Sequence, residues 1–190
     1  MLTRILLIFC LGLPSLAQSA TTILVFGNSL SSGYGIPLQR GWVHLLQSRL
    51  DQSHPGHRVV NASLSGETSH GGAYRIDKAL TTHKPDIIIV ELGGNDGLRG
   101  LSLADTERNL AKIIDIAQRR RAKVLLVGLR LPPNYGAAYT RQFEDMYRRL
   151  ARRFGVERVP FMLEGLGNAQ FLSDRIHPNA AAQSLILGNV

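Results

Sequence analysis

Two patterns of apolar residues alternate along the chain. Short runs of consecutive Val, Ile and Leu predict buried strands, and longer segments with an apolar residue every three or four positions predict helices. Strands are expected at 22–26, 58–61, 86–92, 123–128 and 156–159. Helices are expected at 42–50, around 73–80, at 102–117, at 143–154 and after Pro178.

The strands are apolar throughout rather than at every second position, which is typical of a parallel sheet buried on both faces. The alternation of strands and helices indicates the same architecture. We therefore predict one α/β domain over residues 21–190, a flavodoxin-like three-layer α/β/α sandwich with a mostly parallel sheet of about five strands. Ligands bind such sheets beyond the carboxyl ends of the strands, so candidate chemistry belongs there.

The first residues of the chain follow a different pattern. Arg4 precedes an apolar run over residues 5–16, and small residues stand at Ser15 and Ala17. This is typical of a secretory signal peptide, and the run is shorter than the roughly 20 residues that span a bilayer. We predict a signal peptide over residues 1–17, cleaved after Ala17 or, as second choice, two residues later. The alternative is an uncleaved anchor. Cleavage would give a periplasmic or secreted protein.

Composition excludes several kinds of chemistry. Cys10, the only cysteine, lies in the predicted signal, so the mature protein would have neither disulfides nor thiol catalysis. The formal charge is +8, but the densest basic runs, 119–121 and 148–153, lie on predicted helices without a nucleic-acid motif. We therefore predict no nucleic-acid partner. A basic surface does favour anionic substrates or transient contact with membrane lipid. The histidines lack the spacing of a metal site, so we expect no bound metal.

Polar, glycine-rich motifs follow the predicted strands. They are Gly27-Asn28-Ser29-Leu30-Ser31, Asn61 to Thr68, Gly93-Gly94-Asn95-Asp96 and, near the C-terminus, Asp174-Arg175-Ile176-His177-Pro178. Because the carboxyl ends of parallel strands share one edge of the sheet, we expect these motifs to meet there.

The residue types in these motifs suit acyl transfer. A serine hydroxyl needs a base, usually histidine, and an acid that holds the base in the right tautomer. Ser29 is the candidate nucleophile, and Asp174 and His177 are three residues apart, so that one turn can pair them. The Ser29 and Gly66 N–H groups and the Asn95 amide are candidate donors to an oxyanion. Taken singly, each residue also fits an ordinary turn or an exposed loop.

Taken together, the motifs resemble those of the SGNH (GDSL-type) hydrolase superfamily, in particular its single-domain bacterial esterase, arylesterase, acyl-CoA thioesterase and lysophospholipase branch. The resembling stretches are 27–35, 60–63, 65–69, 90–100, 131–136 and the Asp174-x-x-His177-Pro178 motif, so that the resemblance spans about Thr22 to Gln183. It implies a nucleophile at Ser29, a triad completed by Asp174 and His177, and an oxyanion hole made by Ser29, Gly66 and Asn95.

The resemblance also carries expectations about substrate and environment. It implies hydrolysis of small acyl esters, thioesters or lysophospholipids without metal or organic cofactor. It further implies an exposed acyl groove, with a mobile loop over 97–101 beside it and residues 132–135 in its wall. We expect a monomer. The superfamily motif has aspartate where this chain has Asn28, yet the triad acid is Asp174, so we predict that the triad survives.

Three other functions compete with this interpretation. A carbohydrate O-deacetylase would use the same scaffold and would prefer acetyl esters over longer ones. A non-catalytic ligand-binding protein would use the same crevice without reaction. A nucleotide-binding protein of flavodoxin type is disfavoured, because no phosphate-binding loop follows the first strand.

Four further residues have expected structural roles. Glu91 lies in an apolar strand, where an unpaired carboxylate is costly, so we expect it to be hydrogen-bonded near the strand end. Asp96 is expected to brace the segment that carries Asn95, and Trp42 to belong to the core. We expect His70 to be exposed in the first turn of a helix rather than to line the site.

Overall fold

We describe residues 20–190 of a computed structural model of the protein. The predicted signal peptide, residues 1–17, lies outside the described residues and stays a prediction. Within the described part, no helix combines the length and the apolar character needed to cross a membrane.

One sheet of five parallel strands forms the centre of the molecule, in the spatial order β2-β1-β3-β4-β5. The strands are β1 (Thr22–Gly27), β2 (Arg58–Asn61), β3 (Ile87–Glu91), β4 (Lys123–Val127) and β5 (Glu157–Val159). In the central strands β1 and β3, residues such as Leu24, Ile88 and Val90 have no exposed surface. The predicted architecture is therefore confirmed, and every pairing in the sheet is parallel.

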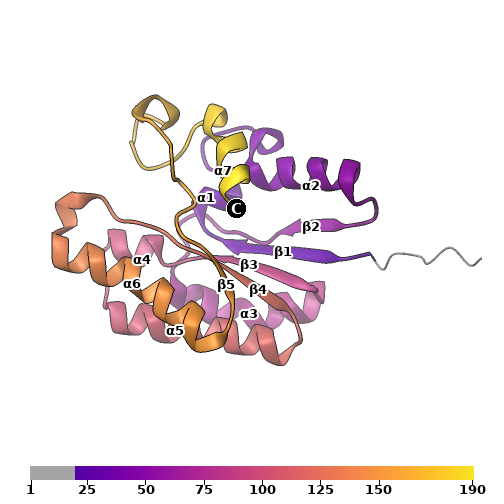
Figure 1. Ribbon diagram of the computed structural model, residues 1–190, viewed down its shortest axis with the longest axis horizontal. Helices are drawn as coiled ribbons and strands as arrows, with labels where there is room; N and C mark the ends of the chain where they lie inside the picture. Colours follow the sequence, from indigo (N-terminus) through magenta and orange to yellow (C-terminus); the bar gives the residue numbers. More distant parts are fainter. Residues whose placement is uncertain (1–19) are drawn as a thin grey trace, which may run out of the picture.

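Helices cover both faces of the sheet (Figure 1). The helices α2 (Trp42–Ser53) and α7 (Gln183–Asn189) lie on one face, and α3 (Ser69–His83), α5 (Leu103–Arg119) and α6 (Ala137–Phe154) lie on the other. Trp42 is buried in the core, as predicted. The C-terminal helix is tied to α2 by a hydrogen bond from the Trp42 N–H to Gln183 Oε1 (3.0 Å).

Local signals explain where several helices begin and end. The Ser102 hydroxyl accepts the Asp105 N–H and caps α5, as its capping signature predicts. Thr68 caps α3 in the same way through the Gly71 N–H. Lys84 takes a left-handed conformation (φ 44°) and ends α3 directly before Pro85, since proline disfavours helical geometry in the preceding residue.

Two short helices beside the carboxyl edge of the sheet were not predicted. One is α1 (Ser29–Ser32), and the other is α4 (Gly94–Leu98), which includes the start of the expected loop over 97–101. Gly93 introduces α4 with a left-handed backbone (φ 105°) that side chains disfavour. Its Cα hydrogen faces the Tyr147 hydroxyl, which would lie 2.5 Å from a Cβ at this position. Gly94, which has low helix propensity, thus begins a helix because of its tertiary surroundings.

Candidate active site

Ser29 lies at the first position of α1, directly beyond the end of β1. Asn28 is the N-cap of this helix, and its Oδ1 accepts the Leu30 N–H (3.0 Å). The Asn28 carbonyl accepts the N–H groups of Ser31 (3.3 Å) and Ser32 (2.9 Å). In residues 20–190, the Ser29 N–H has no protein acceptor and is free to bind another group. The turn therefore presents both the hydroxyl and the amide of Ser29.

Asp174 and His177 lie on a loop that reaches over α1. The carboxylate Oδ1 of Asp174 accepts the Ile176 and His177 N–H groups, each at 2.9 Å, and Oδ2 lies 2.7 Å from His177 Nδ1. His177 Nε2 lies 2.8 Å from Ser29 Oγ. A single turn thus pairs the acid with the imidazole, and the loop brings that pair to a serine 148 residues away.

Electrostatics keep the Asp174 carboxylate ionised. Partial burial alone would raise its pKa, but hydrogen bonds from the His177 N–H, the His177 ring and the Ile176 N–H outweigh it and lower the pKa to about 2. Asp174 is therefore negative throughout the neutral range. The Nδ1 atom of His177 then carries the proton, and Nε2 is left with its lone pair toward Ser29.

The two other candidate oxyanion donors lie on neighbouring turns. Gly66 has a left-handed backbone (φ 79°), and its N–H has no protein acceptor in residues 20–190. The Asn95 amide nitrogen donates one hydrogen to the Glu67 carbonyl (2.9 Å), so the second hydrogen remains available. The sheet order places β1 next to both β2 and β3, so the turns after these strands are adjacent.

A buried carboxylate braces the segment that carries Asn95, as expected of Asp96. Its two oxygens accept the Ser69 N–H (2.8 Å) and the Ser69 hydroxyl (2.6 Å) at the start of α3. The short helix α4 is thereby attached to the segment that follows Gly66. His70, the next residue, is exposed in the first turn of α3, as predicted.

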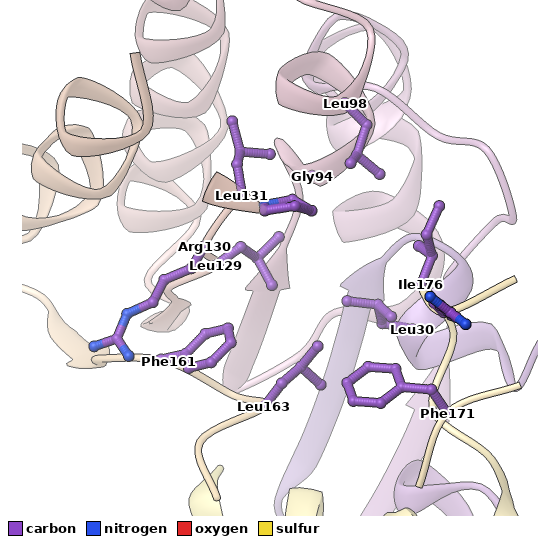
Figure 2. A pocket seen from close by; sticks show the side chains of 12 residues that line it. Leu30, Gly94, Leu98, Leu129, Arg130, Leu131, Phe161, Leu163, Phe171 and Ile176 are labelled. Carbon is purple, nitrogen blue, oxygen red and sulfur yellow. The ribbon is translucent and has the colours of Figure 1, made fainter. Parts of the chain in front are cut away.

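An apolar pocket of about 300 Å³ opens beside these residues (Figure 2). Leu30, Gly94 and Ile176 line it and are the chain neighbours of Ser29, Asn95 and His177. Figure 2 shows the side chains of Leu129, Leu163 and Phe171 directed into this space, whereas the Arg130 guanidinium points away. Most of the remaining wall is apolar as well: Leu98, Leu131, Pro132 and Phe161.

Several contacts at the site were not predicted from the sequence. The Tyr34 ring packs on the His177 imidazole, with ring centres 4.5 Å apart. Ser63 Oγ accepts the Gly27 N–H (3.1 Å), and Asn61 Nδ2 donates to the Ser31 carbonyl (2.7 Å), so the end of β2 supports the nucleophile turn. Phe161, Leu163 and Phe171 lie after β5 in irregular chain, where no periodicity marks them.

The part of the chain over residues 20–190 holds no cluster of three or more His, Cys, Asp or Glu side chains that would bind a metal ion. The arrangement found at the carboxyl edge is instead a hydroxyl, an imidazole and a carboxylate in hydrogen-bonded sequence, with free N–H donors and an apolar pocket alongside. Such an arrangement can carry out nucleophilic acyl transfer.

Comparison with known proteins decides the family. A model of the GDSL-like lipase/acylhydrolase family matches residues 25–185. The chain belongs to this family. Among the relatives of this GDSL-like hydrolase is esterase TesA of Pseudomonas aeruginosa, 46% identical over 98% of this chain and 94% of the relative. Thioesterase 1/protease 1/lysophospholipase L1 of Escherichia coli K12 is 40% identical over 94% of this chain and 86% of the relative.

Solved structures agree with this assignment. A crystal structure of TesA superposes with a TM-score of 0.87 at 46% identity, covering 90% of this chain and 96% of the other. The esterase EstA from Pseudoalteromonas, inhibited by monoethylphosphonate, superposes with a TM-score of 0.85 at 34% identity, covering 89% and 93%. The protein is therefore an enzyme, a serine hydrolase with the SGNH fold.

Proposed function

We propose that this GDSL-like hydrolase cleaves carboxylic esters and acyl thioesters through an acyl-enzyme on Ser29. The observation that carries the proposal is the hydrogen-bonded sequence from Ser29 Oγ to His177 Nε2 (2.8 Å) and from His177 Nδ1 to Asp174 (2.7 Å), set beside an apolar pocket. The three side chains have the order and spacing that serine acyl transfer requires.

Acylation begins with the Ser29 hydroxyl. His177 Nε2 takes its proton as the oxygen attacks the acyl carbon, and ionised Asp174 stabilises the imidazolium that forms. The tetrahedral oxyanion accepts hydrogen bonds from the Ser29 N–H, the Gly66 N–H and the second Asn95 amide hydrogen. Each such donor is worth roughly 10²–10³ in rate.

The acyl-enzyme forms when the tetrahedral intermediate collapses. His177 returns the proton to the departing alcohol or thiol, and the acyl group stays on Ser29. Water then attacks the acyl carbon, His177 accepts the water proton, and the acid leaves as Ser29 regains its hydrogen. Since the leaving group takes only a proton from the enzyme in this scheme, oxygen and sulfur esters both fit it.

The apolar pocket is the proposed site of the acyl chain. Leu30, Gly94 and Ile176, the chain neighbours of Ser29, Asn95 and His177, line this pocket, so we propose that a chain attached to the reacting carbon enters it. Each buried methylene contributes about 0.8 kcal/mol. This supports medium to long acyl substrates over acetyl esters and argues against a carbohydrate O-deacetylase.

Relatives support the range of substrates. Their names include esterase, arylesterase and thioesterase 1/protease 1/lysophospholipase L1. We propose that aryl esters, acyl thioesters and lysophospholipids are substrates here and that no cofactor is needed. We also propose that cleavage of the signal peptide places a monomer, with its hydrolase domain over residues 21–190, in the periplasm or outside the cell. The full chain has a formal net charge of +8, to which the predicted signal peptide contributes only Arg4, and this basic charge supports transient contact with anionic membrane lipid.

Hydrolysis of a series of p-nitrophenyl esters tests the proposal. The wild type should hydrolyse octanoate faster than acetate, and Ser29→Ala should reduce kcat at least about 10³-fold without changing the far-UV circular dichroism. Equal activity of Ser29→Ala would overturn the nucleophile. A preference for acetate would favour the deacetylase, and a wild type that binds but does not cleave any ester or thioester would favour a ligand-binding protein.

A further inference from the structure

A fully buried carboxyl group lies directly beneath the nucleophile turn. Glu91 is the last residue of β3, opposite Gly27 at the end of β1, and none of its surface is exposed. Its Oε2 atom accepts the Asn28 N–H (3.1 Å) and the Ser31 hydroxyl (2.8 Å). A single oxygen thus binds the residue before Ser29 and a residue two positions after it.

These two hydrogen bonds restrict the motion of Ser29 itself. Asn28 is held through its N–H by Glu91 while its Oδ1 accepts the Leu30 N–H. Ser31 is held through its hydroxyl, and its carbonyl accepts the Asn61 amide. Within this turn the Ser29 hydroxyl and N–H are left for His177 and for substrate, so the groups around the nucleophile are fixed and the reacting groups are free.

The surroundings of Glu91 are shaped around its carboxyl group. A Cβ on Gly27 would lie 2.7 Å from Glu91 Oε2, so glycine is what allows the close approach. The second oxygen, Oε1, is buried and has no hydrogen-bond partner among residues 20–190. Burial raises the pKa of Glu91 to about 7, although hydrogen bonds from Asn28 and Ser31 act in the opposite direction.

The burial of an ionised Glu91 carboxylate is not compensated by an ion pair. Among residues 20–190, no arginine or lysine forms an ion pair with Glu91. The ionisable groups that share this interior are Tyr147 from α6, whose own pKa is raised by burial and by the charges of Glu91 and Asp96, and Asp96 from α4. The hydrogen bonds to the Ser29 turn are therefore the interactions that favour the ionised carboxylate.

We propose that Glu91 is a positioning residue for the reaction, which holds the Ser29 hydroxyl and N–H in reactive geometry by accepting hydrogen bonds from Asn28 and Ser31. The inference rests on the proposed function, because it assigns Glu91 a role in a reaction at Ser29. The ionised carboxylate is a stronger acceptor than the neutral acid, so the turn is held more firmly when Glu91 is charged.

Kinetics of Glu91→Gln and Glu91→Ala test the proposal, with the exposed strand residue change Glu157→Gln as the matched control. The concentration of folded active sites is titrated with a fluorophosphonate, so kcat refers to folded enzyme. Glu91→Ala should lower kcat about 10²-fold with KM within about twofold, because a displaced nucleophile reacts more slowly without weaker substrate binding. Glu91→Gln keeps one acceptor oxygen and should recover most of that loss.

The pH profile adds a readout that a purely structural role would not change. The ratio of wild-type to Glu91→Gln kcat should rise between about pH 5 and about pH 9, as the carboxyl ionises in the wild type only. If every folded Glu91 variant, Gln included, keeps the wild-type kcat and a constant ratio, Glu91 is not a positioning residue. A wild type that hydrolyses no ester, or whose Ser29 is not labelled, would instead refute the proposed function itself.

Discussion

The buried Glu91 carboxyl should make the stability of this protein fall as pH rises toward neutrality. Its pKa is about 7 in the folded protein, against an ordinary value of 4.5. The folded state therefore holds the proton more tightly than the unfolded chain does. Between these two values, a rise in pH removes stability, and above about pH 7 the loss is complete.

The structure gives the size of this effect. A difference from 4.5 to about 7 corresponds to about 3 kcal/mol, at about 1.4 kcal/mol per pKa unit. In a domain of this size the melting temperature would change by about 6–12 °C. Asp174 does not contribute in this window, because its lowered pKa of about 2 confines its effect to more acidic solution.

Urea unfolding of the wild type and of Glu91→Gln, each measured near pH 4 and near pH 8, gives the contribution of Glu91 ionisation to the free energy of unfolding. Glu91→Gln lacks the titrating group, so its stability relative to the wild type should improve by about 3 kcal/mol between the two conditions. All other titrating groups are shared and cancel in the comparison. The exposed Glu157→Gln variant should show no such change. An equal pH dependence in the wild type and Glu91→Gln would refute the argument from burial.

Three other changes have expected results. Asp174→Asn should lower kcat for p-nitrophenyl octanoate about 10³–10⁴-fold, because the His177 ring loses its tautomer control; a loss under tenfold would contradict this. Leu163→Trp should lower kcat/KM for the octanoate ester about tenfold or more and leave kcat/KM for the acetate ester unchanged. The control Leu185→Trp, on the exposed face of α7, should change kcat/KM for neither ester. Asn28→Asp should retain activity but lose stability above neutral pH, since two carboxyl groups would then share one buried site. Melting temperatures equal to those of the wild type at every pH would exclude this loss of stability.

The sequence predicted the three inner strands β1, β3 and β4 well because each contains a continuous apolar run. The edge strand β2 has only Val59 and Val60 as apolar residues, yet it was predicted with its observed bounds, Arg58–Asn61. Asp174 and His177 could be expected to pair because they are three residues apart. Ser29 could be expected at the same edge of the sheet because it directly follows a strand of a parallel sheet. Gly66 and Asn95 were candidates because they follow neighbouring strands and can donate hydrogen bonds, and the family resemblance implied the same two residues. Residue spacing and family motifs can both be read without knowing how side chains pack in the folded protein.

Other features depend on contacts between distant parts of the chain. The four-residue helix α1 is too short for a periodic pattern and is fixed by the Asn28 cap and by Glu91. Helix α4 starts from a glycine pair with low helix propensity. The pocket residues after β5 and the contact of Tyr34 with His177 lie in irregular segments, so only the folded arrangement reveals them.

Mass spectrometry of the exported protein after reaction with a fluorophosphonate ester tests the central claim most directly. The account predicts one phosphonyl group per molecule, located on the peptide that contains Ser29, loss of ester hydrolysis in step with labelling, and no label on Ser29→Ala. Stoichiometric labelling of another residue, or full hydrolytic activity in a protein labelled on Ser29, would contradict it.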